Sequence, residues 1–319
     1  MTDQLPSDGQ AASGPHDLAQ MPLVDPADKG GLVSVFRRRH LLRLMVKREL
    51  RARYIDSKFG LAWSYINPIT RFFTFYFVFG VIIGRGAIPH FAIHLFAGMV
   101  LVNLFVESFN AGTRSIMANK AVVQKMPLPR EIFPVASVLV TLYHVGPQMV
   151  VLVVACLATG SFSPDLVGLF AAAIAFVMVT LLAIGMAIMF AAINVMFRDF
   201  TRAVLIITNM LPFSVPMMYP YTLVKERFGD FAIIYHLYLF NPLAEAVLLF
   251  QRGFWITTVS DKDAAEASDL YGFKPGLSVN FPPHLVERGL IFLAVSVVFV
   301  FFAQWVFNRL DDRIPDRLV

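Results

Sequence analysis

The chain has 319 residues, of which 57% are hydrophobic and only 15% are charged, whereas a soluble protein carries about a quarter of charged residues. The charged residues are clustered, so that long segments with almost no charge alternate with short basic segments, which is typical of a polytopic helical membrane protein. The net charge of +5 comes from Lys and Arg beside apolar segments, and it therefore does not indicate nucleic-acid binding.

The N-terminal region divides into a polar tail and a basic segment. Residues 1–31 are polar and contain four prolines, which predicts a flexible tail in the cytoplasm. Within residues 32–60, a helical projection separates apolar from basic side chains. The apolar side holds Leu42, Met45, Val46 and Leu50, and the basic side holds Lys47, Arg48 and Arg51. The segment is either a basic stop signal beside the first span or an amphipathic helix on the inner leaflet, and we favour the helix.

Six apolar segments are long enough to cross a hydrocarbon core of about 30 Å. They are approximately Leu61–Gly84, Phe91–Ala111, Ile132–Ala158, Leu166–Met196, Ala203–Tyr221 and Leu285–Phe307. The sequence therefore predicts an all-α polytopic membrane protein with six transmembrane helices over residues 61–308.

The distribution of positive charge orients these spans. With the N-terminus inside, most Lys and Arg residues fall in cytoplasmic segments, while the outer loops near Arg85 and at 161–164 are nearly uncharged. The positive-inside rule then places both termini in the cytoplasm, including the tail 309–319. An even number of spans agrees with this placement.

The loop between spans five and six, residues 222–284, contains two further apolar stretches. Phe231–Phe240 and Leu243–Phe250 are each too short to span, and Asn241-Pro242 separates them as a break. We expect two short re-entrant helices that dip into the outer leaflet. Irregular backbone at that depth survives only where protein or water shields it.

The sequence lacks the motifs of an enzyme. It contains no phosphate loop of the form G-x-x-x-x-G-K-[ST], no H-E-x-x-H and no G-x-S-x-G. His90 and His94 have helical spacing, but a structural role at the interface is favoured over a metal site. Cys156 is the single cysteine, which excludes a disulfide within the chain. The apolar spans hold few acids, notably Glu107 and Glu245, which argues against a proton-coupled carrier. We therefore expect no catalytic residue, no metal site and no cofactor in this chain.

Four motifs, in order along the six-span topology, point to a family. They are Arg48-Glu49-Leu50-Arg51-Ala52-Arg53-Tyr54 followed by Ser57, Gly60, Leu61, Trp63 and Asn67-Pro68; the stretch from Lys125 to Pro134; Phe197-Arg198-Asp199-Phe200; and Tyr219-Pro220 with Asn241-Pro242-Leu243 and Arg252-Gly253. Together they resemble ABC-2 type permeases, most of all the branch that exports O-antigen, capsule and teichoic acid. The sequence is also similar to actinobacterial members that export a galactan precursor.

The resemblance implies a transporter subunit that is not itself an enzyme. It implies a homodimer in the bacterial cytoplasmic membrane, two copies of a separate ATPase subunit that carries ATP and Mg, and a polyprenyl-diphosphate-linked glycan as substrate. In this family the loop between spans two and three contacts the ATPase. The residues expected to couple to the ATPase are Lys125, Pro127, Pro129, Arg130 and Glu131 in that loop, with Arg198 and Asp199 between spans four and five. The two prolines fix φ and stiffen the loop.

Span one carries the candidate substrate path. Phe72, Phe75, Tyr76 and Phe79 are spaced i, i+3, i+4, i+7 and share one helical face, whereas Phe73 and Phe77 lie off it. Aromatic rings can stack on the C–H faces of sugars, so this stripe is a candidate lining of a glycan channel. The alternative is lipid contact or helix packing. Arg71 either snorkels to the interface or attracts the lipid diphosphate at the cytoplasmic mouth of the channel.

Span five carries the candidate gate. Pro212, Pro216 and Pro220 follow four-residue spacing, which places them on one side of a helix. Each removes a backbone donor, so the helix is bent either for packing or where the channel opens.

Two other functions compete with polysaccharide export. A drug or small-lipid ABC-2 exporter would share the topology and the ATPase partner. A membrane-embedded glycosyltransferase would need acidic residues at a membrane face to hold a metal and a sugar nucleotide. Glu131 and Asp199 are isolated in short basic loops, which disfavours that enzyme.

Overall fold

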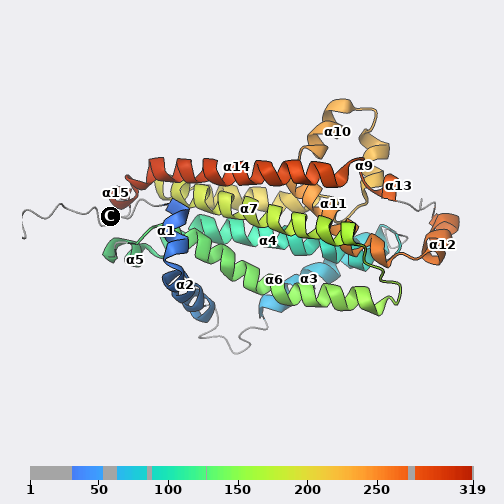
Figure 1. The fold of residues 1–319 in the computed structure, drawn as a ribbon, viewed down its shortest axis with the longest axis horizontal. Coiled ribbons are helices and arrows are strands. Elements are labelled where there is room, and N and C mark those ends of the chain that lie inside the picture. Colours follow the sequence, from blue (N-terminus) through green and yellow to red (C-terminus); the bar gives the residue numbers. More distant parts are fainter. Residues whose placement is uncertain (1–30, 53–62, 85–87, 127, 272–276, 318–319) are drawn as a thin grey trace, which may run out of the picture.

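The computed structural model describes residues 31–52, 63–84, 88–126, 128–271 and 277–317. All regular structure in this part of the chain is helical. The long helices run along the long axis of the molecule, with α1, α2, α5 and α15 at one end and α12 and α13 at the other (Figure 1). We refer to these as the α5 end and the α12 end. The predicted N-terminal tail falls almost entirely outside the described residues.

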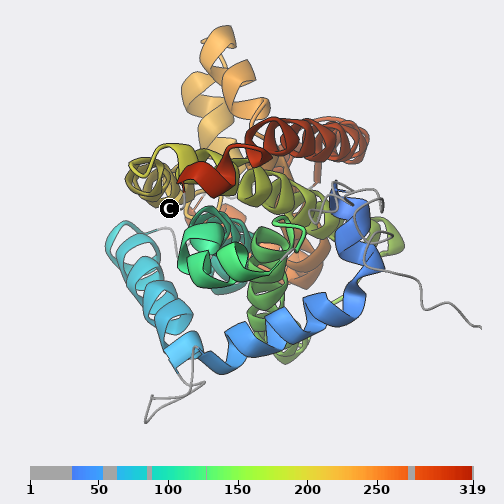
Figure 2. The same cartoon turned by 90° about the vertical axis from the view of Figure 1, so that its left-hand side faces the viewer.

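Five helices are long and apolar enough to cross a membrane. They are Tyr65–Ile82, which combines α3 (Trp63–Phe75) with the π-helix η2 (Tyr76–Ile82), α4 (Phe91–Ala118), α6 (Ile132–Ala158), α7 (Leu166–Met196) and α14 (Leu285–Asp311). The all-α polytopic prediction is confirmed, and these five agree with predicted spans one to four and six. Helix α4 lies inside the bundle, with α3, α6, α7 and α14 around it (Figure 2).

The fifth predicted span is wrong as a single helix over Ala203–Tyr221. Helix α8 (Phe200–Met210) continues only through the 3₁₀ turn η4 (Leu211–Phe213), and the chain then turns until α9 (Tyr221–Phe228) begins. Fourteen helical residues rise about 21 Å, which is short of a hydrocarbon core of about 30 Å. The reason is that Pro212 and Pro216 lack the N–H groups that a continuing helix needs.

The turn after η4 is packed inside protein. Val215, Met217 and Met218 are buried, and Gln251 Nε2 donates to the carbonyl oxygen of Pro216 at 2.8 Å. The close approach depends on Gly98 of α4, because a Cβ atom there would lie 2.4 Å from Cβ of Met217. The irregular backbone is thus satisfied by protein groups, as a membrane environment requires.

The two short helices predicted in the loop between spans five and six are present, and the predicted break between them is confirmed. Helix α10 (Ala232–Leu239) and helix α11 (Pro242–Phe254) meet at Asn241 with a bend of 66°. The Asn241 side chain caps α11 by accepting from the backbone N–H groups of Leu243 and Ala244. How deeply these helices enter a bilayer stays a prediction.

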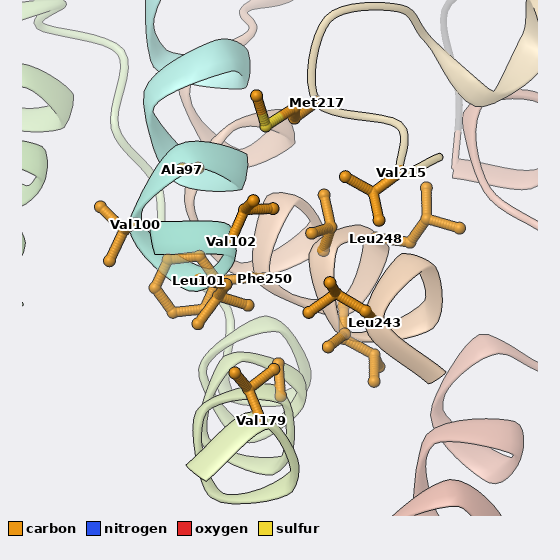
Figure 3. Packing of buried hydrophobic residues seen from close by; sticks show 14 of the residues in the cluster. Ala97, Val100, Leu101, Val102, Val179, Val215, Met217, Leu243, Leu248 and Phe250 are labelled. Atoms are coloured by element: carbon orange, nitrogen blue, oxygen red, sulfur yellow. The ribbon is translucent and has the colours of Figure 1, made fainter. Parts of the chain in front are cut away.

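Helix α11 joins the core of the spans. Its side chains meet those of α4, α7 and the buried turn (Figure 3). The residues labelled there are Ala97, Val100, Leu101 and Val102 of α4, Val179 of α7, Val215 and Met217 of the turn, and Leu243, Leu248 and Phe250 of α11. Helix α11 and the buried turn therefore share one hydrophobic core with the long helices.

Helices α1 (Gly31–Arg37) and α2 (Arg39–Ala52) lie across the α5 end of the bundle (Figure 2). Helix α2 is amphipathic as predicted: Leu42 is buried, Met45 and Val46 are half-buried, and Lys47 and Arg48 are exposed. Its apolar side packs against α6. The remainder of the predicted segment, residues 53–60, lies outside the described residues.

The remaining helices are short. They are α5 (Lys120–Lys125), η5 (Ile256–Thr258), α12 (Asp261–Tyr271), α13 (Leu277–Asn280) and α15 (Ile314–Arg317).

Candidate functional site

A stripe of polar side chains runs along α4. Asn103, Glu107, Asn110 and Arg114 are spaced by four, three and four residues, which places them on one helical face. Asn103 is buried, Glu107 and Asn110 are half-buried, and Arg114 is exposed. Such groups are costly against hydrocarbon and mark a functional path or a polar contact. We call these four residues the polar stripe.

Helix α8 borders the polar stripe on one side. Asn110 Nδ2 donates to Thr208 Oγ1 at 3.0 Å. Thr208 and Val204, one turn apart, are the two buried residues of α8. Four large apolar side chains of α8 are exposed: Leu205, Ile206, Ile207 and Met210. Helix α8 therefore uses one narrow face within the chain and leaves the rest for lipid or for another chain.

Helix α3 lies on the same side of the bundle as α8, and Figure 2 shows both to the left of α4. The ring of Phe72 meets Phe96 of α4 edge-on at 5.5 Å between centroids. The ring of Tyr76 stacks on Phe91 of α4 at 6.2 Å. Phe96 falls on the same helical face of α4 as the polar stripe, since seven residues separate it from Asn103. Helix α3 thus covers one end of this face and α8 borders the other.

The predicted aromatic stripe has one buried side. Phe72, Phe75, Tyr76 and Phe79 are all half-buried and pack against the core, whereas Phe73 and Phe77 are 63% and 58% exposed. The contacts of Phe72 and Tyr76 are those of the helix-packing alternative. Phe79 lies in the π-helix η2, which has more residues per turn than an α-helix. The i, i+3, i+4, i+7 spacing predicted from the sequence therefore does not hold along the whole stripe. A role as channel lining stays a prediction.

Arg71 is exposed on α3, away from the core. The structure therefore leaves both of its interpretations open: a side chain that snorkels to the interface, or one that attracts the lipid diphosphate.

The predicted coupling loop is fastened to the end of α14. Arg130 Nη1 donates to Oδ1 of Asp311 at 2.6 Å and to its carbonyl oxygen at 3.0 Å. Glu131 is buried and accepts from Gln304 Nε2 at 2.9 Å. Burial raises the pKa of the Glu131 carboxyl, an effect that the Gln304 bond opposes. Both residues thus point toward α14 rather than away from the bundle.

The other coupling candidates differ in exposure. Lys125, at the end of α5, is exposed, Pro129 is buried, and Pro127 lies outside the described residues. Arg198 and Asp199 are exposed in the turn between α7 and α8. Lys125, Arg198 and Asp199 are therefore the members of the predicted set that are free to meet a partner.

Asn194 holds the turn that carries Arg198 and Asp199. Its Oδ1 accepts from the backbone N–H of Thr201 at 3.1 Å and from the Thr201 hydroxyl at 2.7 Å, and its Nδ2 donates to the carbonyl oxygen of Thr113 at 3.2 Å. This role could not be predicted from the sequence, because the partners of Asn194 are on α4 and α8.

The three candidate gate prolines do not share one helical face, which corrects that prediction. Pro212 lies in η4, Pro216 in the buried turn, and Pro220 precedes α9. Because the helix ends at Phe213, four-residue spacing no longer places them together. They redirect the chain, and a role in gating stays a prediction.

Comparison with known proteins identifies the family. A family model described as "ABC-2 type transporter" matches residues 40–254. The chain belongs to the ABC-2 type transporter family. The resemblance seen in the sequence motifs is thereby confirmed, and the chain is a membrane subunit of a transporter.

Curated proteins similar to this ABC-2 chain carry a more specific name. The "O-antigen export system permease protein RfbA" of Klebsiella pneumoniae is 27% identical over 214 residues, covering 67% of this chain and 80% of that protein. The protein of the same name from Myxococcus xanthus is 25% identical over 229 residues, covering 72% and 85%.

Proposed function

We propose that this ABC-2 chain is the permease subunit of an exporter that moves a polyprenyl-diphosphate-linked cell-envelope polysaccharide, such as an O-antigen or a galactan, across the bacterial cytoplasmic membrane. The observation that carries the proposal is the polar stripe of α4 in an otherwise apolar helix, bordered by α3 and α8. A hydrophilic polymer needs such a face to cross hydrocarbon. The names of the similar proteins support a polysaccharide as that polymer.

A glycan path along the polar stripe needs protein on its open side as well. Within one chain, most side chains of α8 are exposed, and so is Arg114. A second copy of the chain, placed against this side, would enclose the polar stripes of both copies in one channel. The proposal therefore includes a homodimer.

Energy comes from a separate ATPase, since the sequence has no phosphate loop. Lys125, Arg198 and Asp199, exposed near the α5 end, are its proposed contact. The basic α2 lies at this end, which supports a cytoplasmic position for it. In the test, the purified chain alone hydrolyses no ATP, and depletion in cells makes lipid-linked glycan accumulate inside. Glycan that still reaches the outside after depletion contradicts the proposal.

A small-lipid or drug exporter is the second candidate because of an apolar cavity. It has a volume of about 520 Å³ and lies between α3, α4 and α6, with Ile69, Phe96 and Val151 among its lining residues. A hydrocarbon chain fits this lining. Efflux of a lipid or drug without any change in glycan location on depletion would favour this candidate.

A further inference from the structure

A second polar site lies beyond the outer end of α8, apart from the polar stripe. It is a pocket of about 410 Å³ between η4, α9 and α10, within the range of about 300–1,000 Å³ that small-ligand sites occupy. Four of its lining residues are aromatic: Phe213, Tyr219, Phe228 and Tyr238. We call this the aromatic pocket.

The walls of the aromatic pocket are held in place. The Tyr219 hydroxyl donates to the carbonyl oxygen of Phe213 at 3.0 Å, which fixes that ring beside the end of η4. Arg288 of α14 donates to the carbonyl oxygen of Leu239, next to Tyr238, at 2.8 Å. Arg288 also pairs with the buried Glu245 of α11 at 3.0 Å. Span six therefore braces the wall formed by α10.

The charge of the aromatic pocket is positive. Arg227 is the single charged residue among the described residues that line it, and no ion pair involves Arg227 in the described part of the chain. A guanidinium presents a planar set of donors that suits neighbouring hydroxyl or carboxylate oxygens. The pocket thus offers aromatic side chains on its walls and one hydrogen-bonding cation.

We propose that the aromatic pocket is a carbohydrate subsite that holds one neutral or acidic sugar residue of the exported glycan. The sugar's C–H face stacks on Phe228 and its oxygens accept from Arg227. An amino sugar is disfavoured because its ammonium group would lie beside the guanidinium. The pocket begins at Phe213, the last residue of the turn η4 that continues α8, so it is placed to receive a chain that leaves the path along α8. This inference rests on the proposed polysaccharide substrate.

Binding of three sugars to the complex of the full chain with its ATPase tests the subsite. The complex is placed in phosphatidylcholine nanodiscs and titrated with methyl β-galactoside, glucuronate and glucosamine by saturation-transfer NMR. Galactoside and glucuronate are expected to bind more tightly than glucosamine. Phe228→Leu should weaken galactoside about fivefold, from a loss of about 1 kcal/mol for one aromatic contact. Arg227→Gln should abolish the preference for glucuronate over glucosamine.

Two matched controls come from the same hairpin. Phe231→Leu changes an exposed aromatic residue outside the pocket, and Lys225→Gln changes an exposed cation on α9 outside it. Both should leave sugar binding unchanged. Equal effects of Phe228→Leu and Phe231→Leu overturn the subsite. Loss of sugar binding in phosphatidylglycerol nanodiscs overturns it too, because Arg227 then pairs with the net negative charge of an anionic lipid headgroup, which zwitterionic phosphatidylcholine lacks.

Glycan export in depleted cells complemented with each variant separates this inference from the proposed function. Export that requires the chain, together with no sugar binding by the wild-type complex, removes the subsite and leaves the function. Glycan export that does not require the chain removes the function itself.

Discussion

Arg130 and Asp311, which are 181 residues apart in the sequence, form an ion pair with 2.6 Å between Nη1 and Oδ1. Their side chains are only 17% and 21% exposed. The pair joins the loop between α5 and α6 to the end of α14. A motion applied to this loop by a docked ATPase would therefore reach span six directly.

Arg130→Ala should loosen this connection. The loss of a hydrogen-bonded charge pair costs about 1.5–3 kcal/mol, so the melting temperature of the complex should fall, and ATP hydrolysis should continue with less export. The control is Lys225→Ala, an exposed cation on α9 outside the proposed ATPase contact, which should leave the melting temperature unchanged. Restored coupling in the double variant Arg130→Asp with Asp311→Arg would confirm the pair. Normal export by Arg130→Ala would show that the loop is only a connector.

The long helices could be predicted from sequence because apolar length alone defines them. The polar stripe could also be predicted from the sequence, because its four polar residues recur at helical spacing along an apolar segment. A search for acidic side chains alone finds only Glu107 among them. The partner of Arg130 could not be predicted. Asp311 is far along the chain, and no local pattern relates the two residues.

The prediction of span five as one helix was wrong for a different reason. Its composition is apolar throughout, and hydropathy does not distinguish a membrane-spanning helix from a buried turn. Pro212 and Pro216 end the helix. The turn that follows is held inside the protein by the packing of Met217 against Gly98 and by the bond from Gln251 to the Pro216 carbonyl. Both are tertiary contacts between separate elements.

Gly98→Ala should disturb that buried turn. The new Cβ atom would lie 2.4 Å from Cβ of Met217 and 3.1 Å from its Cα, and overpacking of a core costs about 1–3 kcal/mol. We expect a lower melting temperature and weaker protection of residues 214–219 in hydrogen exchange. Gly146→Ala is the control: Gly146 lies within α6, and apart from its chain neighbours nothing lies within 4 Å of a new Cβ. That change should be close to neutral, because the restriction that Pro147 places on the residue before it offsets the gain of Ala over Gly in a helix. A similar loss at both positions would refute the close contact.

The four residues of the aromatic stripe differ in what their rings contact: two meet α4, and two meet each other. Phe72→Leu with Tyr76→Leu removes the rings that meet Phe96 and Phe91, so the melting temperature should fall. Phe75→Leu with Phe79→Leu removes rings that meet each other at 6.4 Å, and we expect slower export with a smaller loss of stability. The exposed pair, Phe73→Leu with Phe77→Leu, is the control for both. If that control slows export as much as the Phe75 and Phe79 changes, the stripe does not line the path.

The polar stripe of α4 gives the most direct test of the path. Asn103→Ala and Asn110→Ala each remove an amide from this face, and we expect slower glycan export from both at normal expression. Asn110→Ala also removes the donor to Thr208, but the Thr208 hydroxyl keeps a partner in the Leu205 carbonyl at 3.1 Å. Val204 of α8 stays buried in the core, so α8 should stay in place. Export is measured as glycan at the cell surface per unit of permease in the membrane.

The control for the polar stripe lies on the same helix. Ser108 is fully buried, and its position five residues after Asn103 turns it away from the stripe. Ser108→Ala should therefore leave export unchanged. If all three alanine variants slow export equally, α4 is sensitive to any change in packing. If none does, the glycan does not travel along this face, and the channel must be sought on the exposed side of α8.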